Sequence, residues 1–144
     1  MKKIIFTVLT LFVLCGMVYG QAAPKDGVQQ EFYDTGELKA EITYKNGVLN
    51  GDKKKFYPNG QEMLVTTYKD GKIVGVSKTF YEDGKLQSET PYKDGQKDGE
   101  RKEYYQNGKV QTILTYKDRR VVNKKTFDEK GKRKTDEDIE EAAE

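Results

Sequence analysis

The side chains of this sequence that could take part in catalysis are few. Its 144 residues include no histidine, and the single cysteine, Cys15, lies in an apolar stretch near the start of the chain. Nucleophilic catalysis by Ser-His-Asp or Cys-His groups needs an imidazole base, and the usual zinc sites use histidine and cysteine ligands. The sequence therefore excludes these sites, and the carboxylates remain as the abundant acid–base groups.

Two carboxylates in a glycosidase-like arrangement could act as acid and base. The glutamates of the strand-like segments, however, lie among lysines on an expected polar face: Glu31, Glu37, Glu41, Glu82, Glu89, Glu100 and Glu103. Nothing in the pattern marks two of them as a buried pair. The Asp-Gly pairs at 70–71, 83–84 and 94–95 lack the alternating ligands and terminal glutamate of a calcium loop, so we predict turns there. We predict no catalytic, cofactor-binding or metal-binding residue, and a protein that is not an enzyme.

Four tyrosines recur every 24 residues and are the strongest candidates for a binding surface: Tyr33, Tyr57, Tyr81 and Tyr105. An exposed tyrosine supplies rigid contact area at a low cost in conformational entropy. The alternative is that these rings pack on neighbouring units of the chain. We predict the four as binding residues and leave the packing alternative open.

The tyrosine spacing is that of a 24-residue unit that makes up most of the chain. Copies cover residues 27–50, 51–74, 75–98 and 99–121, and a partial copy covers 122–134. A fixed period of this length indicates a repeat architecture, in which each unit is stabilised by its neighbours. Such arrays favour an extended binding or structural surface over an enzyme pocket.

Each unit should contain two strands and two turns. One turn has the pattern Tyr-x-x-Gly, and Pro58 in the second copy fits the first corner of a type I turn followed by a glycine bulge. The other is an Asn-Gly or Asp-Gly hairpin turn, which becomes Asp118-Arg119 in the last full copy, with one residue missing, so the array should be irregular there. Alternation between the turns predicts half-buried strands. The predicted fold class is all-β, a single-sheet antiparallel meander of tandem β-hairpins with about nine short strands.

A second aromatic column directly precedes the tyrosines: Phe32, Phe56, Phe80, Tyr104 and Phe127. Adjacent strand residues face opposite ways, so we predict that this column is buried and the tyrosine column partly exposed. At the other end, Thr135 and the acids after it could begin a short C-terminal helix. Disorder of this acidic tail, residues 135–144, is the alternative, because the tail has few apolar residues.

Residues 1–20 are predicted to be a secretion signal peptide. Lys2 and Lys3 precede an apolar run, and Val18-Tyr19-Gly20 offers a cleavage site before Gln21. A retained membrane anchor is the weaker alternative, because the apolar run is short for a spanning helix. A linker, 21–26, then leads to the repeats. The mature chain would have no cysteine and hence no disulfide, and we expect it in the periplasm, the cell envelope or outside the cell.

The charges argue against a nucleic-acid partner. Without Lys2 and Lys3, the 26 basic residues fall to 24, which equals the 24 acidic residues. Nucleic-acid binding would need a strong basic stripe, which this balance does not supply. Lysine-rich strand beginnings, Lys53–Lys55 and Lys124–Lys125, could still meet anionic headgroups or, with nearby aromatic rings, sugars.

The units resemble the MORN repeat in its bacterial variant, through the pattern Gly-x(4)-aromatic-Tyr-x-x-Gly-x-[Leu/Val] followed by Tyr-Lys-[Asn/Asp]-Gly. The resemblance covers residues 27–118 and, in part, 122–131. It implies elongated sheets of consecutive hairpins that serve in protein association, scaffolding and sometimes contact with membrane lipids. Many bacterial relatives are labelled YwqK-like antitoxins of toxin–antitoxin systems.

The leading hypothesis is an exported, non-enzymatic repeat module that mediates protein–protein interaction or scaffolding in the cell envelope, with an unknown protein as its partner. The alternative is a module that binds anionic lipid at a membrane surface, or a glycan. An antitoxin-like component of a toxin–antitoxin system is the weakest hypothesis, because a cytoplasmic role conflicts with the export signal.

Overall fold

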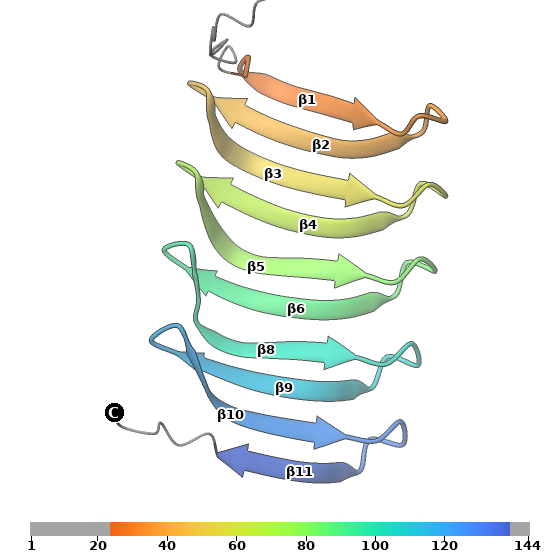
Figure 1. Ribbon diagram of the computed structural model, residues 1–144, viewed down its shortest axis with the longest axis vertical. Helices are drawn as coiled ribbons and strands as arrows, with labels where there is room; N and C mark the ends of the chain where they lie inside the picture. Colours follow the sequence, from red (N-terminus) through yellow and green to blue (C-terminus); the bar gives the residue numbers. More distant parts are fainter. Residues whose placement is uncertain (1–23, 139–144) are drawn as a thin grey trace, which may run out of the picture.

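A computed structural model describes residues 24–138, which form one open antiparallel sheet of eleven strands. Each strand lies beside the one before it in the chain, except that the short strand β7 pairs only with β6, so that β6 and β8 are neighbours (Figure 1). The strands are β1 (Gly27–Phe32), β2 (Leu38–Lys45), β3 (Val48–Phe56), β4 (Glu62–Lys69), β5 (Lys72–Phe80), β6 (Leu86–Lys93), β7 (Gln96–Lys97), β8 (Gly99–Tyr104), β9 (Val110–Lys117), β10 (Arg120–Phe127) and β11 (Arg133–Asp138). The predicted meander is confirmed, with eleven strands in place of nine.

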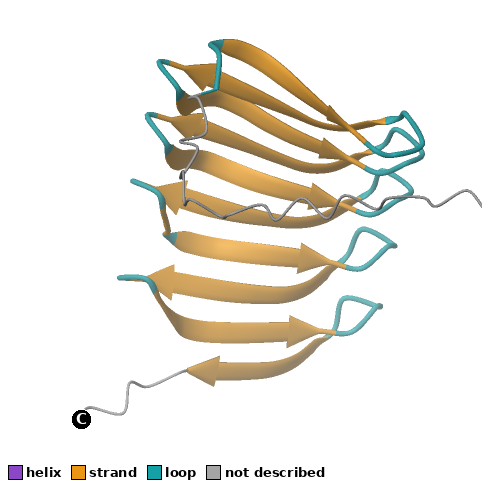
Figure 2. Ribbon diagram, turned by 45° about the horizontal axis from the view of Figure 1, so that its top comes forward, coloured by secondary structure: helices purple, strands orange, loops and turns teal. Residues whose placement is uncertain are grey.

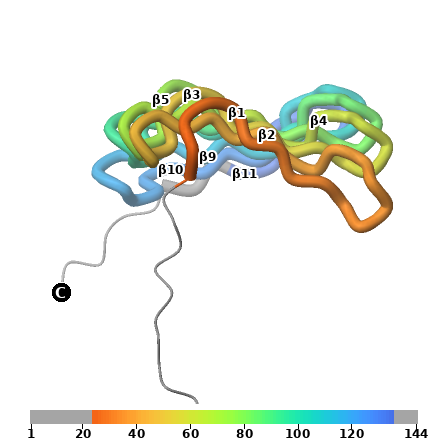
Figure 3. The backbone as a smooth tube through the Cα atoms, turned by 90° about the horizontal axis from the view of Figure 1, so that it is seen from above, coloured from red at the N-terminus to blue at the C-terminus, as the bar shows by residue number. Residues whose placement is uncertain are grey.

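The sheet is one layer thick. Turns alternate between its two margins (Figure 2), and viewed along the stack the strands of successive copies follow one shallow curve (Figure 3). No element among residues 24–138 lies over either face. Within these residues no helix has the length and apolar character needed to cross a membrane.

The Tyr-x-x-Gly turns, called first turns below, are type I turns closed by a glycine. In the second copy the Gly60 amide donates to the Tyr57 carbonyl at 2.9 Å, and the Tyr57 amide donates to the Gln61 carbonyl at 2.8 Å. Gly60 has a φ of +84°, which glycine adopts with little strain. The geometry predicted from Pro58 is confirmed, and the same pair of bonds recurs around Tyr33, Tyr81 and Tyr105.

The Asn-Gly and Asp-Gly turns, called second turns, have a left-handed backbone at both corners. Asn46 and Gly47 have φ angles of 53° and 73°, as in the type I′ turns that suit two-residue hairpins. Asp118 and Arg119 take the same conformation, with φ angles of 50° and 69°. The last copy therefore retains its turn although arginine replaces glycine.

The residue missing from the last full copy is lost from a bulge. Between β2 and β3, three residues, 50–52, lie opposite the single residue Thr43 where the register shifts. At the equivalent place between β9 and β10, Val122 alone is extra. The predicted irregularity is confirmed, and it lies in the bulge. The two-residue turn is needed to close the hairpin, whereas a bulge can lose a residue and leave the strand pairing on both sides intact.

Replacing Arg119 by glycine is expected to stabilise the protein by about 1 kcal/mol. A non-glycine residue is strained at a φ of 69°, whereas glycine tolerates this angle. The greater freedom of glycine in the unfolded chain offsets only part of this gain in stability. Urea unfolding of both proteins measures the difference. The matched control is Gly95→Arg, at a φ of +81° in the preceding second turn, which should destabilise by a similar amount. Equal midpoints for Arg119→Gly and the parent chain would contradict the prediction.

The core is thin and partly polar. The buried side chains of the described residues are Ala40, Ile42, Thr66, Ser88 and Thr90. Cross-strand partners place them on one face of the sheet, as where Lys53 pairs with both Ile42 and Thr66. The hydroxyls pair with one another, Thr66 with Ser77 at 2.6 Å and Ser88 with Thr79 at 2.7 Å, which offsets the cost of burying them.

Two predictions about side chains and the C-terminal end were wrong. Residues 135–138 do not begin a helix, because they form strand β11, which pairs with β10 and crosses the expected boundary at 134. An open β10 edge offers backbone hydrogen bonds to alternate residues of a short segment, whereas a short helix is marginal alone. Residues 139–144 lie outside the described part. The Phe32 column is not buried, since Phe32 is 56% exposed and its counterparts are half-buried, because no second layer covers them.

Candidate interaction surface

The four predicted binding tyrosines join each repeat to the next. Each hydroxyl donates to the backbone carbonyl that precedes the next copy's first turn: Tyr33 to Phe56 at 2.7 Å, Tyr57 to Phe80 at 2.8 Å, Tyr81 to Tyr104 at 2.6 Å and Tyr105 to Phe127 at 2.9 Å. We call this series the tyrosine ladder. All four rings are half-buried. The four hydroxyls therefore bind the neighbouring repeat, as in the packing alternative. A binding role for the exposed parts of the rings stays a prediction.

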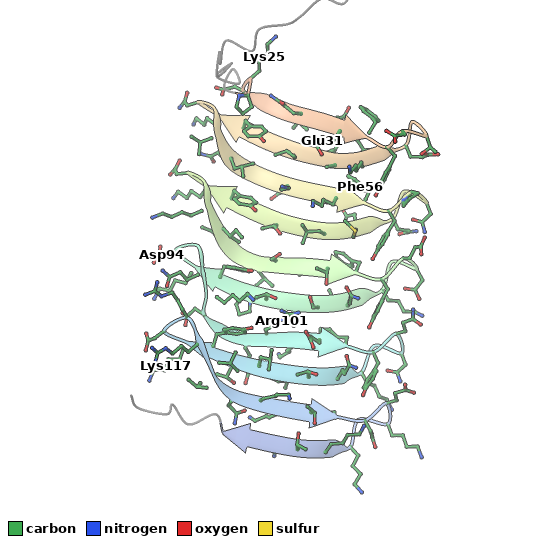
Figure 4. The ribbon with its side chains drawn as sticks, viewed as in Figure 1. Lys25, Glu31, Phe56, Asp94, Arg101 and Lys117 are labelled. Carbon is green, nitrogen blue, oxygen red and sulfur yellow. The ribbon has the colours of Figure 1, made fainter. Side chains whose placement is uncertain are left out.

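Further bonds run along both margins of the sheet. At the first-turn margin the Asn59 and Asn107 amides donate to the carbonyls of Glu82 and Glu129 in the next copy, both at 2.9 Å. At the second-turn margin the Gly71 amide donates to the Leu49 carbonyl of the preceding hairpin at 2.8 Å. Figure 4 shows Phe56 toward the first-turn margin and Asp94 and Lys117 at the opposite one. Both margins are therefore held by contacts between neighbouring repeats.

The two ends of the ladder differ. In the partial copy Asp128 stands in the tyrosine place, and its carboxylate accepts the Lys130 and Lys132 amides of its own turn at 2.9 and 2.8 Å. The ladder therefore ends in a turn that closes on itself. At the other end, no repeat among residues 24–138 lies outside β1, and Phe32 and Val28 of this strand are 56% and 60% exposed.

One face carries a lysine at the middle of the first strand of successive copies, which we call the lysine row: Lys54, Lys78, Lys102 and Lys125. Acids interrupt this row. Glu41 lies opposite Lys54, and Glu89 lies between Lys78 and Lys102. Lys54 also forms an ion pair with Glu62 at 3.0 Å, and this hydrogen bond raises the pKa of Lys54. The row is therefore a mixed-charge surface.

The carboxylates considered for catalysis are spread over the sheet. Gln30 donates to Glu41 at 2.9 Å, Arg101 pairs with Glu103 at 2.6 Å, and Tyr104 donates to Glu89 at 2.6 Å. Asp70 and Asp94 take left-handed turn conformations, as predicted for turn residues. Among residues 24–138 no three side chains of the metal-ligating types gather. These carboxylates therefore have a structural role, because each one binds a side chain on its own strand or on a neighbouring strand.

Tyr104 is expected to ionise only at about pH 12, because burial, together with the hydrogen bond to Glu89 and its charge, raises its pKa to about 12. An unfolded tyrosine ionises near a pKa of about 10, so the Tyr104 contribution to stability is full below about pH 10 and is lost as the pH rises through about 12. Ultraviolet titration of the parent chain and of Tyr104→Phe isolates this group by difference. A Tyr104 transition centred near the ordinary tyrosine value would contradict the assignment.

Sequence reasoning missed the residues at the open end and along the first-turn margin. Asn59 and Asn107 were treated as turn formers, although their side chains also reach the next copy. The repeat pattern predicts burial of Phe32 along with its counterparts in other copies and makes no distinction for Val28. The membership of these two residues in the first copy was the available signal, because an end copy lacks a neighbour on one side.

Three segments of the chain match the family model of the MORN repeat variant: residues 25–46, 73–94 and 97–118. These three segments are similar to MORN repeats. Each matched segment begins two residues before the first glycine of a copy and ends in its second turn. Residues 51–72 of the second copy lie outside these segments, and this copy has Glu62 where the matched ones have Leu38, Leu86 or Val110. No curated protein matched the chain. MORN repeats are generally modules for interaction with proteins or lipids, and not enzymes.

Proposed function

We propose that the chain is an exported, non-enzymatic module that binds a protein partner or scaffolds proteins in the cell envelope. The observation that carries the proposal is the uncovered sheet. Within residues 24–138 no second layer covers either face, and large apolar side chains stay exposed: Val28, Phe32, Val48, Val76 and Val122. Most domains bury a sheet against another layer, so an open sheet of this width suits a partner that supplies one.

Export to the envelope rests on the sequence of residues 1–20, which has a basic start, an apolar run and a cleavage pattern. The mature chain would then work where disulfides are common but would have no cysteine to form one. The hydrogen bonds between repeats supply the cross-links instead. The tyrosine ladder joins every copy to the next at the first-turn margin, and the Gly71 and Gly95 amides join the first three copies at the second-turn margin.

A protein partner is favoured over an anionic membrane by the mixed charge of the lysine row. Glu89 lies between Lys78 and Lys102, and Glu41 lies opposite Lys54. Attraction to anionic headgroups grows with uninterrupted basic charge near the surface. Alternating signs instead suit a partner surface with its own pattern of charges.

Photo-crosslinking in cells that export the chain tests the proposal. A photoreactive residue at Val76, which is 46% exposed on the sheet face, should crosslink to one protein in the envelope fraction, with a yield that saturates. The same residue at Lys130, in an exposed turn, is the matched control and should give little product. A chain that remains in the cytoplasm, or that gives no crosslink from positions on either face or the edge, contradicts the proposal.

The second candidate is binding to anionic lipid, which the 24-residue spacing of Lys54, Lys78 and Lys102 favours. Vesicle flotation at low salt would detect it, and Lys78→Glu with Lys102→Glu should abolish it. Lys45→Glu with Lys93→Glu, which changes two exposed lysines at the second-turn margin, is the control of equal charge. No flotation at low salt removes this candidate. The antitoxin-like role of YwqK-like relatives is the weakest proposal, because export would separate the chain from a cytoplasmic toxin.

A further inference from the structure

The two edge strands of the sheet differ in how they are protected. Strand β11 has the sequence RKTDED, in which only Thr135 is uncharged. Strand β1 has the sequence GVQQEF, in which only Glu31 is charged. Charged residues on an edge strand discourage pairing with another chain, and an uncharged apolar edge invites it. Charge thus protects the β11 edge, whereas no strand among residues 24–138 pairs with the outer side of β1, whose Val28 and Phe32 are 60% and 56% exposed.

The tyrosine ladder identifies what the β1 edge lacks. In four successive copies a carbonyl just before the first turn accepts a tyrosine hydroxyl from the preceding copy, namely the carbonyls of Phe56, Phe80, Tyr104 and Phe127. The equivalent carbonyl of the first copy belongs to Phe32. No repeat among residues 24–138 lies outside β1 to supply a tyrosine to it. The first copy therefore presents the acceptor half of a junction that the chain builds four times.

The same comparison fixes the direction and register of a missing strand. The outer neighbour of β3 is β2, and that of β5 is β4, both antiparallel. In the first of these pairs residues 53–55 lie opposite residues 40–42, and the residues of β1 one repeat earlier are 29–31. An occupant of the β1 edge would therefore run antiparallel to it and pair with residues 29–31.

We propose that β1 is the docking edge for an antiparallel β-hairpin of a partner protein, whose turn tyrosine donates its hydroxyl to the Phe32 carbonyl and whose apolar side chains cover Val28 and Phe32. The inference rests on the proposed protein-binding function and names the partner's chemistry. A second copy of this chain fits poorly as the occupant. Its free end offers the charged strand β11 and has Asp128, already bonded to its own turn, in place of the donor tyrosine.

A constrained hairpin tests the edge directly. The probe is a peptide with the sequence of residues 51–69, closed by a disulfide between cysteines added at its ends, which presents strand β4 and Tyr57. Titrated into the mature full-length chain, it should bind and slow amide exchange across residues 27–32. The peptide with Tyr57→Phe should bind about five-fold more weakly, the effect of one hydrogen bond of about 1 kcal/mol.

Chain variants separate the edge from the rest of the sheet. Val28→Lys should remove binding of the probe, because it places a charge on the exposed edge, and Gln87→Lys, at an exposed position of the central strand β6, should not. Both sites are solvent-exposed, and circular dichroism verifies the fold of each variant. Binding that is equal for Val28→Lys and the parent chain, or no slowing of exchange in residues 27–32 at millimolar probe, overturns the inference.

The cellular partner distinguishes this inference from the function it rests on. If the parent chain and Val28→Lys crosslink the same envelope protein equally, the edge assignment fails and the protein-binding function stands. If neither crosslinks any protein, the function itself fails. Sedimentation that shows dimers of the parent chain and monomers of Val28→Lys would assign the edge to a second copy and overturn the partner named here.

Discussion

Replacing Tyr81 by alanine is expected to lower the free energy of unfolding by about 3 kcal/mol, a value typical of losing a large aromatic ring. The ring is half-buried between two interior repeats, and its hydroxyl donates to the Tyr104 carbonyl at 2.6 Å. Tyr81→Phe keeps the ring and should cost about 1 kcal/mol, the usual net value of one hydrogen bond. Urea unfolding followed by circular dichroism measures both changes.

Tyr33 provides the matched control, because its junction joins only the end copy to the rest. In a repeat array an end unit can unfold with little effect on the others. Tyr33→Ala should therefore speed amide exchange mainly in β1 and β2, while Tyr81→Ala should speed it on both sides of the third junction. Equal exchange patterns for the two variants, or no loss of stability in Tyr81→Ala, would contradict a structural role for the ladder.

The second large effect is expected at Gly51, where Gly51→Ala should destabilise the protein by about 2–3 kcal/mol. Gly51 has a φ of +118°, and a Cβ added there would lie 2.9 Å from Cγ2 of Thr43. The substitution therefore combines backbone strain with a clash in the bulge between β2 and β3. Thermal and urea unfolding of the variant provide the measurement.

Gly27→Ala separates the two causes. Gly27 has a similar φ of +102°, but no atom lies within 4 Å of an added Cβ. This control should cost only the backbone strain, and the difference between the variants reports the clash with Thr43. If Thr43→Ala fails to recover part of the stability lost in Gly51→Ala, the clash is not the cause.

The fold could be predicted because its determinants are local. The Asn46-Gly47 pair and its counterparts select two-residue turns, and Pro58 and Gly60 select the other turn type. With both turns known, alternating residues between them leave few alternatives to a meander. The C-terminal end could not be predicted in this way, because Thr135 is equally suited to begin a helix or to pair with Thr126. In the structure the two hydroxyls pair at 2.6 Å.

The candidate surface was predicted less completely, since it depends on how neighbouring copies meet. The period identified Tyr33, Tyr57, Tyr81 and Tyr105, but only the stacked strands show that each hydroxyl reaches a carbonyl 22 or 23 residues further on. The contrast between a closed Asp128 turn and an open Phe32 strand also requires the order of strands in the sheet.

The tyrosine bonds all point from one copy to the following one, which gives the array a head and a tail. The carbonyl of an inner unit accepts a tyrosine hydroxyl from the preceding copy, and its own tyrosine donates to the following copy in the same way. Duplicating or deleting a whole 24-residue inner copy would therefore keep a tyrosine bond at every junction. The number of inner units could thus change by whole copies at little energetic penalty, while the specialised first and last copies stay in place. The length of the sheet would then change without any change to the two edge strands.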